Sequence, residues 1–169
     1  SEKEAALQLA RAKVQAAELA LEKGETSPIQ QIRLYLEAIG ACERAPSDPE
    51  VDSEIKSASK AMNIFVVQLK TDNSQGTDAE NLIRECLELE NDFSSSDYIR
   101  PVALARLVLS NRRAAALLKK AEGLISAPSP EKSAVKAAEK DFLAVAGMYR
   151  ENDPSIDGSC RPLLFRADL

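Results

Sequence analysis

The side chains best suited to binding chemistry gather in one stretch of this chain, residues 98–121. This stretch contains no acidic residue and six basic ones. They are Arg100, Arg106, Arg112, Arg113, Lys119 and Lys120. Three of them, Arg106, Arg113 and Lys120, are seven residues apart, so on a helix they would line one edge with Arg112 and Lys119 beside it. The preceding stretch, residues 78–97, holds seven acids against Arg84 alone.

This charge asymmetry supports two interpretations. In the first, an acidic helix lies along a basic helix and the charges solvate one another at the surface. In the second, the basic edge docks on an acidic surface of a partner protein. Nucleic acid is disfavoured as the partner, because the whole chain has a net charge of −5 and only 4% aromatic residues. Both phosphate neutralisation and base stacking are therefore weakly supported.

The sequence contains few residues of the types that usually perform catalysis. The chain has no His, which removes the commonest general base and metal ligand. The six glycines are scattered singly, so no phosphate-binding loop is present. Cys42, Cys86 and Cys160 stand far apart, so neither a zinc ribbon nor a disulfide framework is indicated, although the sequence is compatible with one disulfide. We therefore expect no catalytic residue, no metal and no cofactor.

The elements that would position these residues are helices. Apolar residues recur at three- and four-residue spacing over six segments, and Ala and Leu dominate them. The predicted helices end at Gly24, before Pro46, in the polar run 71–76, at the serines 94–96, near Ile125 and at Asn152. Capping residues predict helix starts at Ser27, Ser47, Thr77 and Ser129.

The sequence therefore predicts an all-α fold. We expect a single antiparallel bundle of about six helices, four long and two short, over residues 1–151, followed by an irregular tail over residues 152–169. The first, third, fifth and sixth helices, each roughly 30–35 Å long, are expected to form the frame. Phe65 and Phe142 fall on inward stripes and should be core residues. No apolar run has the length that spans a membrane, so membrane insertion is not expected, whereas peripheral association stays open.

The tail contains a short apolar group, Leu163, Leu164 and Phe165, after a series of polar and turn residues. This group is expected either to fold back on its own bundle or to insert into a groove of a partner.

An acidic helical bundle without His and Trp and with an extended end is similar, in architecture and composition, to the small extrinsic proteins on the lumenal side of photosystem II. This resemblance implies an extrinsic stabilising subunit of a membrane complex, held by charge and a terminal segment. The leading hypothesis is broader: a non-catalytic interaction or structural protein, the subunit or adaptor of a larger protein assembly, which docks through the basic edge, the tail or both.

Three further questions stay open at this point. A small-molecule-binding or catalytic bundle is an alternative, because a pocket built in three dimensions leaves no linear motif. The chain begins at Ser1 without a signal-peptide pattern, so both the cytoplasm and a compartment reached after removal of a leader are compatible with it. The oligomeric state is not indicated.

Overall fold

The structure, a computed structural model, describes residues 1–24 and 27–151, with side chains described through residue 144. Its helices are α1 (Glu2–Glu22), α2 (Pro28–Glu43), α3 (Pro49–Thr71), α4 (Gly76–Asp92), α5 (Arg100–Leu124) and α6 (Lys132–Glu151), with a 3-10 turn at Asp97–Ile99. No strand occurs among these described residues. The prediction of an all-α chain with about six helices is confirmed, and the predicted tail, residues 152–169, lies outside the described residues.

The boundary between α1 and α2 follows the predicted chemistry. Gly24, just beyond the end of α1, adopts a φ of +68°, a left-handed conformation that costs glycine little. The Ser27 hydroxyl then accepts a hydrogen bond from the Gln30 backbone N–H at 3.2 Å, and Pro28 occupies the first position of α2. The cap satisfies one of the orphan donors at the helix start, and proline needs no donor there.

Two other predicted caps lie one or two residues away from the observed ones. At α3 the cap is Asp48 rather than Ser47, and its Oδ1 accepts from the Glu50 backbone N–H at 2.9 Å. At α4 the cap position is Gln75 rather than Thr77, and it makes no side-chain cap hydrogen bond. Several polar residues precede each helix, and the sequence alone does not determine which of them caps the first backbone N–H groups.

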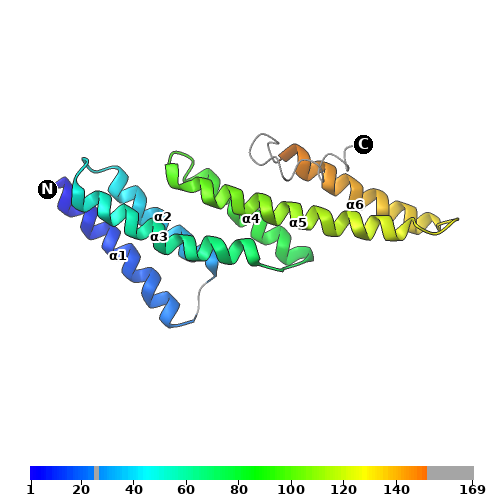
Figure 1. Cartoon of the computed structure of the whole chain (residues 1–169), viewed down its shortest axis with the longest axis horizontal. Helices are drawn as coiled ribbons and strands as arrows, with labels where there is room; N and C mark the ends of the chain where they lie inside the picture. The colour runs from blue at the N-terminus through cyan, green and yellow to red at the C-terminus, as the bar shows by residue number, and fades with distance from the viewer. Residues whose placement is uncertain (25–26, 152–169) are drawn as a thin grey trace.

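The first three helices pack side by side as a three-helix unit (Figure 1). Helix α2 lies between the other two, and nine of its sixteen residues are buried. Phe65 of α3 is buried, as predicted, and its ring stacks on Tyr35 of α2 with the centroids 6.0 Å apart. The prediction that α2 is a short addition to a frame of longer helices is therefore wrong, because α2 contacts both neighbours and is apolar over most of its circumference.

Helix α5 connects this unit to the far end of the molecule. Its first half packs against α3 and α4, where Val102, Ala105 and Leu109 join the same core as the three-helix unit. Its second half extends beyond them, and α6 returns along it as a helical hairpin (Figure 1). Helix α6 packs on α5 and makes no comparable contact with α1 or α3. Four long and two short helices are present as predicted. The long helices do not pack together as one frame, however, and the molecule is elongated (Figure 1).

Candidate interaction surfaces

Two arginines of the basic stretch connect α5 to α4. Arg106 is only 5% exposed, and its Nε and Nη2 donate to the two carboxylate oxygens of Glu90 at 2.5 and 3.0 Å. Arg113 donates to the Gly76 carbonyl at 2.8 Å and to the carboxylate of Glu80. An acidic helix therefore lies along a basic one here, as the first interpretation of the charge asymmetry expected.

The other members of the predicted edge also turn toward the chain itself. Arg112 donates to the carbonyl oxygens of Lys70, at 2.5 Å, and Asp72, which lie at the end of α3 where backbone acceptors lack intrahelical partners. Lys120 places its Nζ 3.4 Å from Oδ2 of Asp141 on α6. These side chains fasten α3 and α6 to α5.

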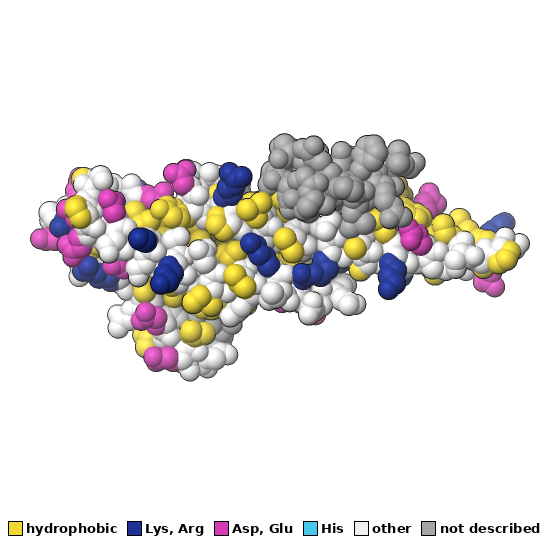
Figure 2. All heavy atoms as spheres, in the orientation of Figure 1, with side chains coloured by type: hydrophobic (Ala, Val, Ile, Leu, Met, Phe, Trp, Pro, Cys, Tyr) yellow, Lys and Arg dark blue, Asp and Glu magenta, His cyan; other side chains and the backbone are white. Residues whose placement is uncertain are grey.

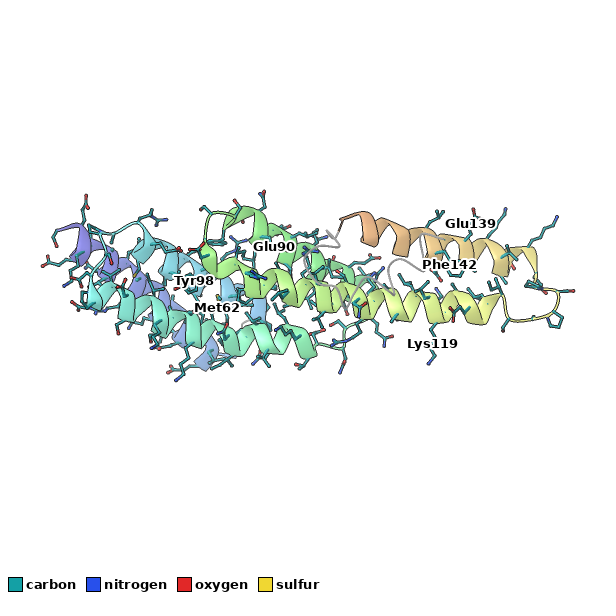
Figure 3. All side chains as sticks on the ribbon, turned by 45° about the horizontal axis from the view of Figure 1, so that its top comes forward. Met62, Glu90, Tyr98, Lys119, Glu139 and Phe142 are labelled. Atoms are coloured by element: carbon teal, nitrogen blue, oxygen red, sulfur yellow. The ribbon has the colours of Figure 1, made fainter. Side chains whose placement is uncertain are left out.

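Arg100 and Lys119 are the exposed remainder of the basic stretch. Nineteen residues of helix, about 28 Å, separate them, and Lys119 points away from α6 (Figure 3). In the view of Figure 2, Lys and Arg side chains stand apart from one another, with apolar and uncharged atoms between them. Of the predicted basic docking edge, Arg106 and Arg113 are covered by α4. The other four residues are exposed, so docking through them stays a prediction. The other predicted docking residues, Leu163, Leu164 and Phe165, lie outside the described residues.

A groove of about 870 Å³ lies where the α3–α4 connection, α5 and α6 meet. It is lined by charges of both signs, including Arg112, Arg113, Lys120, Glu80 and Asp141. These groups pair with one another or with backbone carbonyls, but Oδ2 of the buried Asp141 and Nε of Arg113 have no hydrogen-bond partner among the described residues.

A second, smaller groove of about 330 Å³ lies on the other flank of the α5–α6 hairpin. We call it the hairpin groove, and it is lined by Ile125, Val135, Ala138, Glu139, Phe142 and Leu143. Glu139 is its one charged residue and points away from α5 (Figure 3). The exposed fractions of Ile125, Val135 and Leu143 are 40%, 43% and 61%. Phe142, predicted as a core residue, is only half-buried, because α6 has α5 as its one substantial helical neighbour.

A third surface lies on α1, directly opposite the residues that α1 buries. We call it the outer seam, and it consists of Ala5, Leu9, Ala12, Ala16 and Leu19, at steps of four and three residues. All five are exposed, Leu9 by 46% and Leu19 by 48%. This spacing is present in the sequence. The sequence prediction assigned one apolar stripe to each helix, however, so it did not identify this second stripe on the opposite face of α1.

The buried cysteines offer no reactive group. Cys42 and Cys86 are both buried and not disulfide-bonded, and burial raises the pKa of the Cys86 thiol to about 12. Within the described part of the chain, no three Cys, Asp or Glu side chains are arranged to hold a metal ion. None of the described helices combines the length and the apolar character needed to cross a bilayer.

Comparison of the chain with family models, with curated proteins and with solved structures found no match.

Proposed function

We propose that this chain is a non-catalytic interaction protein, in which helices α1–α4 and the first half of α5 form a stable body and the α5–α6 hairpin is an arm that binds a helix of a partner protein. The observation that carries this proposal is the hairpin groove, an apolar surface on a helix that, within the described residues, packs mainly along α5.

The three-helix unit contains a third helix, which the hairpin lacks. There, each helix contacts two others, and the central side chains Ile32 and Leu36 are fully buried. In the hairpin, Val135 and Leu143 of α6 and Ile125 at the end of α5 stay exposed by 40% or more. A third helix laid into the groove would contact α5 and α6 together, which is the usual way that a helical bundle covers such a face.

The groove also defines the chemistry of the partner segment. Its lining is apolar apart from Glu139, so a complementary helix would present an apolar stripe with a basic residue at its edge. Burying a Leu, Ile or Val side chain completely contributes roughly 1.5–3 kcal/mol. Three side chains that are about half exposed can therefore supply a few kcal/mol toward the cost of association.

A matched pair of positions tests this proposal. Leu143 in the hairpin groove and Ile64 on α3 have the same exposed fraction, 61%. A photo-crosslinking residue is placed at each position, and the proteins are irradiated in an extract of the source cells. We expect position 143 to trap one discrete partner protein and position 64 to trap none. Leu143→Glu should abolish trapping from a probe at Val135, whereas Ile64→Glu should not.

The crosslinked peptides also show whether the chain's own tail, rather than a partner protein, occupies the hairpin groove. If position 143 links only to residues 152–169 of the same chain, the groove holds the chain's own tail and the proposal is wrong. If both positions trap the same mixture, the groove is not a specific site. The alternatives of an extrinsic membrane-complex subunit and of a small-molecule-binding bundle gain no specific support from the residues that the structure describes.

A further inference from the structure

The hairpin groove combines an apolar lining with acidic residues beside it. Ile125 of α5 and Leu143 of α6 belong to the apolar lining, and Glu139 lies with Phe142 on the same stretch of α6 (Figure 3). On α5, Glu122 precedes Ile125 by three residues, so the two lie on the same side of that helix. A segment that fits this groove therefore carries apolar side chains with positive charge next to them.

One segment of the chain has this composition. Residues 161–166, which lie outside the described residues, read Arg-Pro-Leu-Leu-Phe-Arg. Three apolar residues are adjacent in it, and Arg161 and Arg166 stand at its two ends. None of the other residues in the range 152–169 is basic, so the positive charge of this range is confined to the two sides of the apolar group.

We propose that residues 161–166 occupy the hairpin groove of their own chain and must leave it before a partner helix can bind. This inference rests on the proposed function, because it concerns the regulation of the same groove. In the occupied state, the apolar group of the segment covers the exposed Val135 and Leu143, and its arginines lie near Glu139 and Glu122. The groove is thus closed by an autoinhibitory contact.

The connection to α6 is long enough for this return. Helix α6 continues to Glu151, eight residues beyond Leu143, which is about 12 Å of helix. Nine residues, 152–160, join the end of α6 to the segment. A chain of that length spans up to about 30 Å when it is extended, so the segment can reach the groove without any change in α5 or α6.

Covalent attachment makes a weak contact effective. A few apolar side chains and two exposed ion pairs give weak binding, with a dissociation constant on the order of 0.1 mM. A short linker supplies a local concentration on the order of 1 mM, so the segment fills the groove about nine-tenths of the time. The apparent affinity of a partner falls with the open fraction of grooves, by about tenfold.

Photo-crosslinking of the purified full chain tests the occupied state. A photo-crosslinking residue at position 143 should link to residues 161–166 of the same chain, with a yield that does not depend on protein concentration. The same residue at position 64 should give no such link. A tail variant that combines Leu163→Ser, Leu164→Ser and Phe165→Ser should lower the yield at least fivefold, while its helix content by circular dichroism stays that of the wild type.

A charge swap tests the pairing of the arginines with the acids of the groove. Reversing the acids, by Glu122→Arg with Glu139→Arg, should lower the yield of the link at least threefold, because like charges then face the segment. Adding Arg161→Glu and Arg166→Glu to this variant should restore the link, because opposite charges face one another again.

The matched control for the charge swap reverses two exposed acids of α1, by Glu18→Arg with Glu22→Arg. This control should leave the yield unchanged. A swap that does not restore the link, or a control that weakens it equally, overturns the pairing.

An extract of the source cells tests the regulatory role. The wild-type chain with the probe at position 143 should link both to residues 161–166 and to the partner. The tail variant should trap at least three times as much of the partner, because its groove is open. Equal trapping overturns the proposal.

Failure of this inference is distinguishable from failure of the proposed function. In the purified chain, the absence of a link between position 143 and residues 161–166 overturns the autoinhibitory contact and leaves the proposed function intact. A yield that rises with protein concentration has the same consequence, because it indicates contact between two chains. The proposed function fails, and the regulatory role with it, if neither the wild type nor the tail variant traps a discrete partner.

Discussion

The three-helix unit and the α5–α6 hairpin are built from the same kinds of residue but differ in how many helices surround each one. In the unit, α2 lies between α1 and α3, and its Ile32, Leu36 and Ile39 are fully buried. In the hairpin, α6 packs mainly along α5 as far as the chain is described, and its Leu143 is 61% exposed. The same periodic pattern therefore yields a core in one region and a candidate binding surface in the other.

Ion pairs also differ in burial between the start of the three-helix unit and the contact of α4 with α5. At the start of the three-helix unit, Lys3 and Arg11 reach exposed carboxylates of α3, and such pairs contribute little to stability. Where α4 meets α5, Arg106 and Glu90 form a two-bonded pair largely out of solvent. The buried pair joins the α4–α5 segment through a contact that is costly to break, whereas the exposed pairs mainly orient α1.

The largest expected effect distinguishes the two phenylalanines. Phe65→Ala should lower the free energy of unfolding by about 3–5 kcal/mol, because the ring is buried against Tyr35. Phe142→Ala should cost only about 1–2 kcal/mol, because its side chain is partly exposed and loses less burial. Urea denaturation measures both. Equal losses would show that the hairpin is as well covered as the three-helix unit.

Removing the buried cation should have the next largest effect. Arg106→Met leaves Glu90 without its two-bonded partner, and we expect a loss of about 2–3 kcal/mol. The matched control is Arg84→Met, which removes an exposed i,i+4 pair with Glu88 and should cost about 0–1 kcal/mol. A loss for Arg106→Met no greater than the control would mean that the pair does not hold α5 to α4.

Alkaline pH tests the burial of Cys86 in the core shared by α4 and α5. Its pKa in the folded chain is about 12 against an ordinary value of 9.0, so above pH 9 the unfolded chain releases a proton that the folded chain keeps. Stability present below pH 9 is then lost as the pH rises toward 12, by about 1.4 kcal/mol per pH unit. Denaturant titrations at pH 8 and pH 10 should show a smaller decrease for Cys86→Ala than for wild type. Identical decreases would contradict the burial of this thiol.

The smallest expected effect concerns the clamp that orients α1. The hydrogen bond from the Lys3 ammonium lowers the pKa of Glu50, and Arg11 adds to the effect. The stabilisation is therefore present above the ordinary pKa of glutamate and is lost as the pH falls through the lowered value. Glu50→Gln should reduce the melting temperature slightly at pH 7, and the difference from wild type should shrink below pH 4.5. A difference that grows in acid would be the opposite of this prediction.

The sequence by itself determined the local structure and the chemical inventory of this protein. Three- and four-residue spacing predicted six helices, because an amphipathic helix must place its apolar residues on one face. Ser27 and Gly24 predicted a helix start and a helix end, because their effects depend only on neighbouring backbone groups. The outer seam of α1 could also have been predicted, because the 4-3-4-3 spacing from Ala5 to Leu19 is present in the sequence.

Only the tertiary structure decided which helix, if any, covers each face. The spacing around Phe65 and Phe142 is of the same kind, yet one ring meets Tyr35 in a three-helix core and the other lies partly exposed on α6. Arg106 and Arg113 looked like an exposed edge until α4 was seen to lie along them. The physical reason is that periodicity records which side of a helix avoids water, whereas burial and charge pairing depend on contacts between segments far apart in the chain, and such contacts leave no periodic signal.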